Sequence, residues 1–322
     1  MSSLTLGSLF SGYGGLDLAV KDVLDAVPAW HCETDQAASR VLAHRFPDVP
    51  NLGDVTRIRW KRRHRVDILA GGFPCQDLST AGARRGLGTD TRSGLWVHFA
   101  RAIDALRPRL VVIENVKGIL SAPAHVRALG PIRPGVVPNR ATAIEAVFAD
   151  LAAFGYGPRW ICVRASDVGA PHQRERVFIV ASPADPRRQR IRQRLDSRHT
   201  DGEDREMAGP RTIDLTQPRR GGCPDTGRHR HLGRFGPAAD RWASIVGRPA
   251  HASTERGPRS GRATLAPQFV EWMMGLESGW VTEVPQLSRT AQLRILGNGV
   301  VPQQASLALR ALLDDERWMT DE

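Results

Sequence analysis

Long apolar runs are missing from this chain of 322 residues. Runs such as Leu110–Ile113 are far below the roughly 20 apolar residues that a membrane-spanning helix requires. The first residues also lack the basic stretch and apolar core of a secretory signal. We therefore expect no membrane partner and a location in the cytoplasm or nucleoid of a bacterial host.

Cysteine is scarce, and its spacing excludes two common uses. The chain has four cysteines and no C-x-x-C pair. They are Cys32, Cys75, Cys162 and Cys223. This pattern favours neither a zinc site nor a disulfide framework, so we expect no bound metal. An isolated cysteine is usually a small core residue, so one in a distinctive loop needs another explanation.

Lysine is nearly absent, with 3 residues against 42 arginines, and the basic charge is unevenly spread. Residues 183–263 contain 18 Arg and 10 acidic residues, which is +8 of the total net charge of +11. A general preference for arginine explains the choice of cation but not this clustering. The segment is therefore predicted to face a polyanion.

Outside that segment, short apolar runs alternate with stretches of helical periodicity. Strands are expected at Leu4–Phe10, Trp30–Glu33, Val66–Ala70, Leu110–Ile113, Trp160–Val163 and Val177–Val180. Helices are expected at Leu16–Leu24, Ala37–Phe46, Leu95–Leu106, Ile144–Leu151, Phe235–Val246, Phe269–Met274 and Gln303–Leu313. Continuously apolar strands between helices predict an α/β fold with a doubly wound, mostly parallel sheet, whose ligands bind at the carboxyl ends of the strands.

Residues 183–263 break this alternation, with 10 Gly and 8 Pro among 81 residues. Such a composition is typical of a small irregular domain or a long insertion. We therefore divide the chain into a first domain of residues 1–182, a small irregular domain of residues 183–263, and a segment of residues 264–322 that returns to complete the first domain.

The first expected strand leads into the glycine-rich stretch Phe10–Leu16. Glycines let the backbone approach a ligand closely, and the start of the next helix supplies unpaired N–H groups. With Gly12 and Gly14 as the first two glycines, the dinucleotide-binding pattern G-x-G-x-x-G requires its third glycine at position 17, which is Asp17. A nucleoside without phosphates is therefore favoured over a dinucleotide. Glu33 is placed to accept hydrogen bonds from ribose hydroxyls. Asp54 is a candidate acceptor for an adenine amino group.

The stretch Gly71–Gln76 directly follows the expected strand Val66–Ala70. It places Cys75 at the carboxyl end of a sheet strand, whereas a structural cysteine would lie within the apolar run. A thiolate requires nearby positive charge to lower its pKa. Arg84 and Arg85, further along the same loop, are candidates for this role or for gripping phosphate.

Two further polar groups follow or precede expected strands. Glu114–Val116 ends the strand Leu110–Ile113, at the same edge of the sheet as Cys75, although Asn115 could equally cap a helix. His172–Arg176 opens the last strand before residues 183–263. Its spacing alone does not distinguish a functional group from a surface charge cluster.

Taken together, these motifs resemble the DNA cytosine-5 methyltransferase family, in its bacterial and phage branch. The motifs stand in the family's order and are Phe10–Gly15, Gly71–Gln76, Glu114–Val116, Arg174–Arg176, Phe269–Gly275 and Gly297–Pro302. The resemblance covers nearly the whole chain outside residues 183–263. It implies a Rossmann-like S-adenosylmethionine-dependent methyltransferase, with residues 183–263 as the target-recognition, DNA-binding domain.

By this resemblance, Cys75 attacks C6 of a cytosine flipped out of duplex DNA, so that C5 takes a methyl group from S-adenosylmethionine. Glu114 holds the N3/N4 edge, and Arg174 and Arg176 orient the base and the glutamate. The residues expected to contact DNA are Gln76, Arg84 and Arg85. The residues expected to contact the cofactor are Phe10, Gly12, Gly14, Gly15, Leu16, Glu33, Asp54, Val55, Pro74, Leu95, Asn298 and Val300.

The expected partner is double-stranded DNA, bound by a monomer. The residues leave open whether a cognate restriction endonuclease is a genetic partner or the enzyme is solitary or phage-encoded. A tRNA cytosine-5 methyltransferase is one rival, although such relatives usually carry a Cys-Phe-Thr motif that is missing here. A catalytically silent DNA-binding homologue is opposed by the intact Cys75, Glu114 and Arg174 set. A nicotinamide oxidoreductase is opposed by the missing third glycine.

Overall fold

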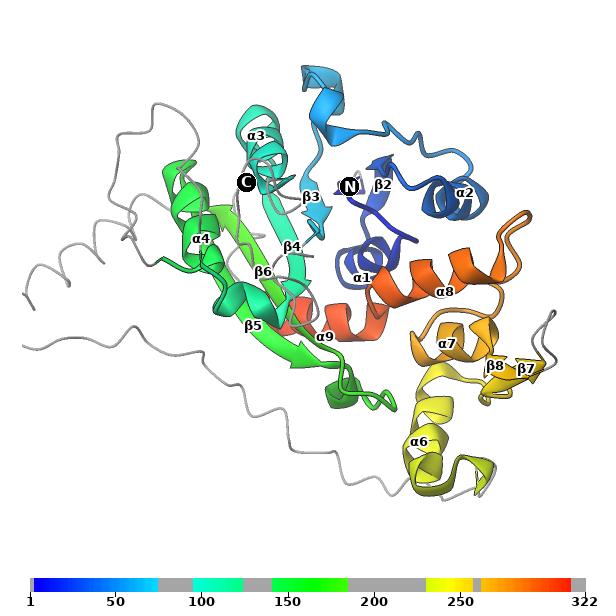
Figure 1. The fold of residues 1–322 in the computed structure, drawn as a ribbon. Helices are drawn as coiled ribbons and strands as arrows, with labels where there is room; N and C mark the ends of the chain where they lie inside the picture. Colours follow the sequence, from blue (N-terminus) through cyan, green and yellow to red (C-terminus); the bar gives the residue numbers. More distant parts are fainter. Residues whose placement is uncertain (1–2, 75–94, 124–140, 185–229, 257–261, 314–322) are drawn as a thin grey trace, which may run out of the picture.

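A six-stranded mixed sheet organises the computed structural model, which describes residues 3–74, 95–123, 141–184, 230–256 and 262–313. The strands lie in the order β2-β1-β3-β4-β6-β5, and only β6 runs against its neighbours (Figure 1). The strands are β1 (Thr5–Leu9), β2 (Val27–Cys32), β3 (Ile68–Gly71), β4 (Leu110–Val116), β5 (Tyr156–Arg164) and β6 (Glu175–Pro183). The predicted mostly parallel α/β sheet is thereby confirmed.

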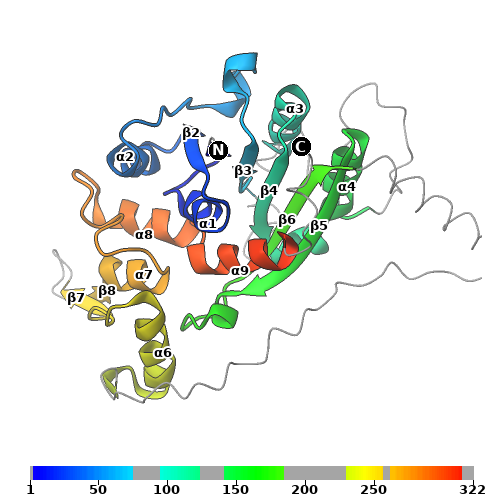
Figure 2. The ribbon, with the colours of Figure 1, turned by 180° about the vertical axis from the view of Figure 1, so that it is seen from behind.

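Helices cover both faces of this sheet, as continuously apolar strands require. On one face, Leu9 and Leu69 pack in a cluster with α3 (Trp96–Leu106) and α4 (Ala143–Ala153). On the other face, Leu6 and Ile68 pack with α1 (Gly15–Leu24) and α9 (Pro302–Leu313) (Figure 2). The closing helix therefore packs on the same face of the sheet as α1.

Two of the differences from the sequence-based expectation bear on the site. Strand β4 continues to Val116, rather than ending at Ile113, because Val116 pairs with Arg176 of β6. Helix α8 (Arg289–Asn298) was not predicted. Its apolar stripe is weak, since Ile295 and Leu296 are its buried residues, and it is defined instead by a Ser288 side chain that caps the nitrogen of Ala291.

A smaller unit beside the sheet contains α6 (Gly236–Val246), β7 (Thr254–Arg256), β8 (Ala263–Leu265) and α7 (Pro267–Met273) (Figure 1). The Trp242 indole is buried and donates to the Trp272 carbonyl at 2.9 Å. The β7–β8 hairpin joins residues on both sides of the predicted boundary at 263, and the domain division remains a prediction. Among the described residues, no helix combines the length and apolar character needed to span a membrane.

Candidate active site

A cavity of about 450 Å³ lies at the carboxyl ends of the strands β1 to β4. It brings together eleven of the predicted residues: Phe10, Gly12, Glu33, Asp54, Val55, Pro74, Leu95, Glu114, Arg174, Arg176 and Asn298. A smaller adjoining pocket of about 50 Å³ is lined by Gly15, Leu16 and Val300 as well as by residues shared with the larger cavity. Gly14 lines neither pocket and instead caps α1 in a left-handed conformation.

Four predicted residues, Cys75, Gln76, Arg84 and Arg85, lie outside the described residues. Pro74, the residue directly before Cys75, lines the cavity.

The carboxylate of Glu33 is fixed by two backbone amides on different segments. Oε2 accepts from the Gly12 nitrogen at 2.9 Å, and Oε1 accepts from the Asp35 nitrogen at 2.7 Å. The first amide belongs to the turn after β1 and the second to the start of α2 (Gln36–Arg45). A carboxylate oxygen has further lone pairs, so Glu33 retains the capacity to accept hydroxyl donors.

Asp54 also lines the cavity and is the cap of the short helix η1 (Val55–Arg57). Its Oδ1 accepts from the Thr56 nitrogen at 2.9 Å. This hydrogen bonding is the main cause of a pKa below the usual range of an aspartate. Asp54 is therefore held as an ionised acceptor at the cavity rim.

Glu114 and Arg176 form an ion pair between neighbouring strands, with Nε 2.9 Å from Oε1. Their side chains are only 12% and 17% exposed. Gly72 makes this arrangement possible, because a β-carbon there would lie 2.8 Å from Glu114 Oε2. The loop that leads to Cys75 thus passes directly over the glutamate. Buried Asn115 adds a second link by donating to the Phe73 carbonyl at 3.3 Å.

Burial raises the pKa of Glu114 above its ordinary value, and Arg176 and then Arg174 oppose this rise. Removal from water disfavours the charged carboxylate, whereas the two guanidinium groups favour it. A glutamate with a raised pKa carries its proton over a wider pH range than a free glutamate does. The side chain can therefore act as a proton donor to a bound base.

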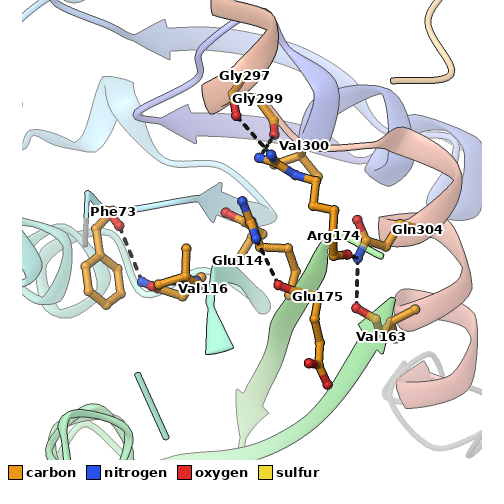
Figure 3. A network of polar contacts seen from close by, with 12 residues as sticks. Phe73, Glu114, Val116, Val163, Arg174, Glu175, Gly297, Gly299, Val300 and Gln304 are labelled. Carbon is orange, nitrogen blue, oxygen red and sulfur yellow. Dashed lines mark hydrogen bonds and ion pairs between the residues drawn. The ribbon is translucent and has the colours of Figure 1, made fainter. Parts of the chain in front are cut away.

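Arg174 has different partners from Arg176. Its guanidinium donates to the Gly297 carbonyl at 2.9 Å and to the Gly299 carbonyl, so it holds both sides of Asn298 (Figure 3). Its own carbonyl accepts from the buried side chain of Gln304 in α9. The residue therefore ties β6 to the carboxyl-terminal segment, which supplies part of the cavity wall.

Tyr13 is a structural residue of the site that the sequence interpretation missed. Its ring is fully buried, and its hydroxyl donates to the Val300 carbonyl at 2.5 Å. The ring packs so closely that a β-carbon on Gly299 or Gly15 would overlap it. Tyr13 thus joins the first glycine-rich turn to the last motif of the chain. No local sequence signal indicates a contact across 287 residues.

A second missed feature is an ion pair across the cavity wall. Arg294 of α8 lies 2.6 Å from Asp35, and both residues line the cavity. The hydrogen bond from Arg294 is the main cause of a lowered pKa for Asp35. This pair connects the carboxyl-terminal segment to the side of the cavity that carries Glu33.

Two chemistries therefore meet in one cavity. Phe10, Glu33 and Asp54 supply an aromatic face and two acceptors, which suits a ribose and an adenine amine. Glu114 and Arg176 supply a proton donor and a buried cation beside the Cys75 loop. The arrangement can hold a nucleoside-type cofactor next to a second, planar ligand.

A model of the family described as C-5 cytosine-specific DNA methylase matches residues 4–217. DNA N-6-adenine-methyltransferase of Escherichia phage P1 is 34% identical over 219 residues, covering 56% of this chain and 29% of that protein. Type II methyltransferase M.NlaIV of Neisseria lactamica is 31% identical over 187 residues, covering 56% of this chain and 42% of that protein. The matched region thus spans less than half the length of these relatives.

Solved structures show a similar fold. Methyltransferase EhMeth of Entamoeba histolytica superposes with a TM-score of 0.61 at 15% identity, covering 98% of this chain and 100% of that one. Dnmt2 methyltransferase of S. pombe gives 0.58 at 14% identity, with 98% and 99% covered. The family match extends over well over half of the chain and includes the turn after β1, the Cys75 loop and the Glu114–Arg176 pair. This chain therefore belongs to the C-5 cytosine-specific DNA methylase family.

Proposed function

We propose that the protein transfers a methyl group from S-adenosylmethionine to C5 of cytosine in duplex DNA. The observation that carries this proposal is the shared cavity, in which the nucleoside-binding set around Glu33 lies beside the buried Glu114–Arg176 pair. Family membership supports the same conclusion.

The cavity fits the cofactor's nucleoside in size and in the hydrogen-bond acceptors and aromatic ring that it offers. About 450 Å³ lies within the range of small-molecule sites. Glu33 is proposed to bind the ribose hydroxyls, Asp54 the adenine amine, and Phe10 the adenine face. Gly12, Gly15 and Leu16 from the first turn, with Asn298 and Val300 from the last motif, are proposed to line the methionine part. Val55, Pro74 and Leu95 complete the proposed wall, and Gly14 shapes the turn from outside it.

The bound cofactor supplies an electrophilic methyl group, and the chain's own residues prepare the cytosine. The Cys75 thiolate is proposed to form a bond to C6 while Glu114 passes a proton to N3. This addition makes C5 nucleophilic, which it is not in the aromatic base. After C5 has taken the methyl group, loss of the C5 proton, breakage of the C6–sulfur bond and return of the N3 proton to Glu114 restore the aromatic ring. The base must leave the stack for these groups to reach it.

Arg174 and Arg176 are proposed to have different roles. Arg176 keeps Glu114 in place through the 2.9 Å ion pair. Arg174 positions the Gly297–Gly299 stretch that carries Asn298. Residues 183–263 are proposed to recognise the DNA, with Gln76, Arg84 and Arg85 contributing from the Cys75 loop. We propose a monomer acting in the cytoplasm, with or without a cognate restriction endonuclease encoded beside it.

The proposal is tested by incubating the protein with mixed-sequence duplex DNA and isotopically labelled S-adenosylmethionine, then identifying the labelled nucleoside by mass spectrometry. We expect 5-methylcytosine, and we expect Glu114→Gln to lose about 100-fold or more of the rate. Label found only in N6-methyladenine, the product that the phage P1 relative's name indicates, or only in tRNA would overturn the proposal.

A further inference from the structure

A strongly basic surface outside the cavity is not used by the proposed reaction. Six of the nine residues from Arg57 to Arg65 are cationic, and none is acidic. The six are Arg57, Arg59, Lys61, Arg62, Arg63 and Arg65, and all of them are exposed. We call these six residues the basic segment. Its formal charge of +6 is more than half of the chain's net charge.

Two indoles in contact hold the basic segment in place. Trp60, between the cations, packs on Trp30 of β2 with ring centroids 5.4 Å apart. The Trp30 indole also donates to the His64 carbonyl at 3.1 Å. His64 closes the short helix η2 (Arg62–His64) and lies edge-on to Trp60. The cations are therefore presented from an anchored piece of backbone.

Carboxylates do not neutralise this charge within the described part of the chain. Arg57 lies 3.5 Å from Asp54, in a pair whose arginine is 86% exposed. Asp67, the next acid along the chain, is bound instead to the backbone and hydroxyl of Thr5. No ion pair joins the other five cations to any described residue. Like charges so close together repel one another, and a polyanion would relieve that repulsion.

The basic segment extends away from the cavity. Asp54 lines the cavity, whereas η2 lies only a few residues before the first residue of β3, at the amino end of that strand. In both views the light-blue coil between α2 and β3 lies at the opposite end of the molecule from α6 and the β7–β8 hairpin (Figures 1 and 2). The basic segment therefore lies apart from α6, the described helix of the proposed DNA-recognising domain.

We propose that the basic segment binds the phosphate backbone of a second segment of duplex DNA. Duplex DNA carries about one phosphate charge per 1.7 Å of axis, so several exposed arginines can each meet a phosphate. Holding a second segment keeps the protein near DNA while the cavity searches for its site. The choice of DNA over other polyanions rests on the proposed function. The charge of the basic segment and its exposure are independent of that function.

The test compares Lys61→Gln/Arg62→Gln with the control Lys21→Gln/Arg310→Gln. The control also removes one exposed lysine and one exposed arginine, from α1 and α9 on the other face of the sheet. Binding to non-specific duplex DNA is measured by fluorescence anisotropy over a range of salt concentrations. None of the four residues lines the cavity.

We expect the slope of log K against log salt to become shallower by up to about 1.8 in the Lys61/Arg62 variant, because each lost phosphate contact contributes about 0.9. The advantage of the wild type over this variant should then shrink about tenfold between about 50 and about 200 mM salt. A bead-bound duplex should also capture a second, labelled duplex through the wild type and the control, but not through the variant.

Equal slopes for the variant and the control, or unchanged capture of the second duplex, would overturn the proposal. Loss of binding to structured RNA with unchanged binding to DNA would overturn it as well. Methyl transfer to a short duplex is measured in parallel. If the slope changes in the Lys61/Arg62 variant but the wild type shows no methyl transfer, only the proposed function is contradicted. If methyl transfer is normal but the slope does not change in the variant, only the second DNA site is contradicted.

Discussion

Replacing Arg176 by Gln tests whether the buried ion pair controls the protonation of Glu114. The Arg176 Nε lies 2.9 Å from Glu114 Oε1, and both side chains are largely buried. Burial raises the pKa of Glu114, and Arg176 is the strongest opposing influence. Arg176→Gln should therefore raise this pKa further, and the stability of the variant should depend on pH more steeply than that of the wild type.

The magnitude follows from the geometry. A hydrogen bond to a charged group contributes about 1.5 to 3 kcal/mol to stability. The pair retains 12% and 17% exposure, so water screens it in part and the cost should stay below the roughly 3 to 5 kcal/mol lost when a fully buried pair is broken. Arg176→Gln should then cost about 1.5 to 3 kcal/mol of unfolding free energy where Glu114 is ionised in the wild type.

The direction of the pH dependence is fixed by the raised pKa. Stability that Glu114 contributes is fully present below its unfolded pKa, near 4.5, and is lost as the pH rises through its folded pKa. The cost of Arg176→Gln should therefore be larger at about pH 8 than at about pH 5, measured by urea denaturation at both values.

Two further variants make this prediction specific. Glu114→Gln should remove most of the pH-dependent cost of Arg176→Gln, since the group that titrates is gone. Lys117→Gln is the control, because it breaks an exposed pair with Glu175 and should cost less than about 1 kcal/mol at either pH. An equal cost of Arg176→Gln at both pH values, or one that survives Glu114→Gln, would refute the reasoning.

Steric, cofactor and loop contacts give three more predictions. Gly299→Ala should lower the unfolding free energy by about 1 to 3 kcal/mol, because its β-carbon overlaps the Tyr13 ring, whereas Gly297→Ala should be neutral or stabilising in thermal denaturation. Glu33→Gln should weaken S-adenosylmethionine binding about tenfold or more in calorimetry, and unchanged affinity would contradict its proposed role. Glu271→Gln should cost about 2 to 4 kcal/mol in urea denaturation, because the buried carboxylate accepts from three backbone amides and one hydroxyl; a loss below 1 kcal/mol would contradict this.

Most of the sheet could be predicted because its strands are apolar on both faces. The runs at Ile68–Ala70 and Leu110–Ile113 have no polar interruption, so their burial follows from composition alone. The end of β4 could not be predicted in the same way. Glu114 and Asn115 are polar, and only their pairing with β6 keeps them in the strand. Helix α8 was missed for a related reason, since much of its surface is exposed.

Within the site, single residues with distinctive neighbours were predictable, and long-range partners were not. Glu33 and Glu114 follow strands and stand in recognisable motifs, and the structure places both at one cavity. The Tyr13–Val300 contact and the Asp35–Arg294 pair join residues more than 250 positions apart. Neither residue type nor spacing encodes such contacts. They exist because α9 packs on α1 and brings the last motif back to the first turn.

Covalent trapping on DNA that contains 5-fluorocytosine tests the central claim most directly. Fluorine at C5 cannot leave as a proton does, so an adduct between Cys75 and C6 would persist once the methyl group has been transferred. The wild type should form a denaturation-resistant protein–DNA adduct only when S-adenosylmethionine is present, and Cys75→Ser should form none. No adduct with the wild type, or the same adduct with Cys75→Ser, would contradict the account.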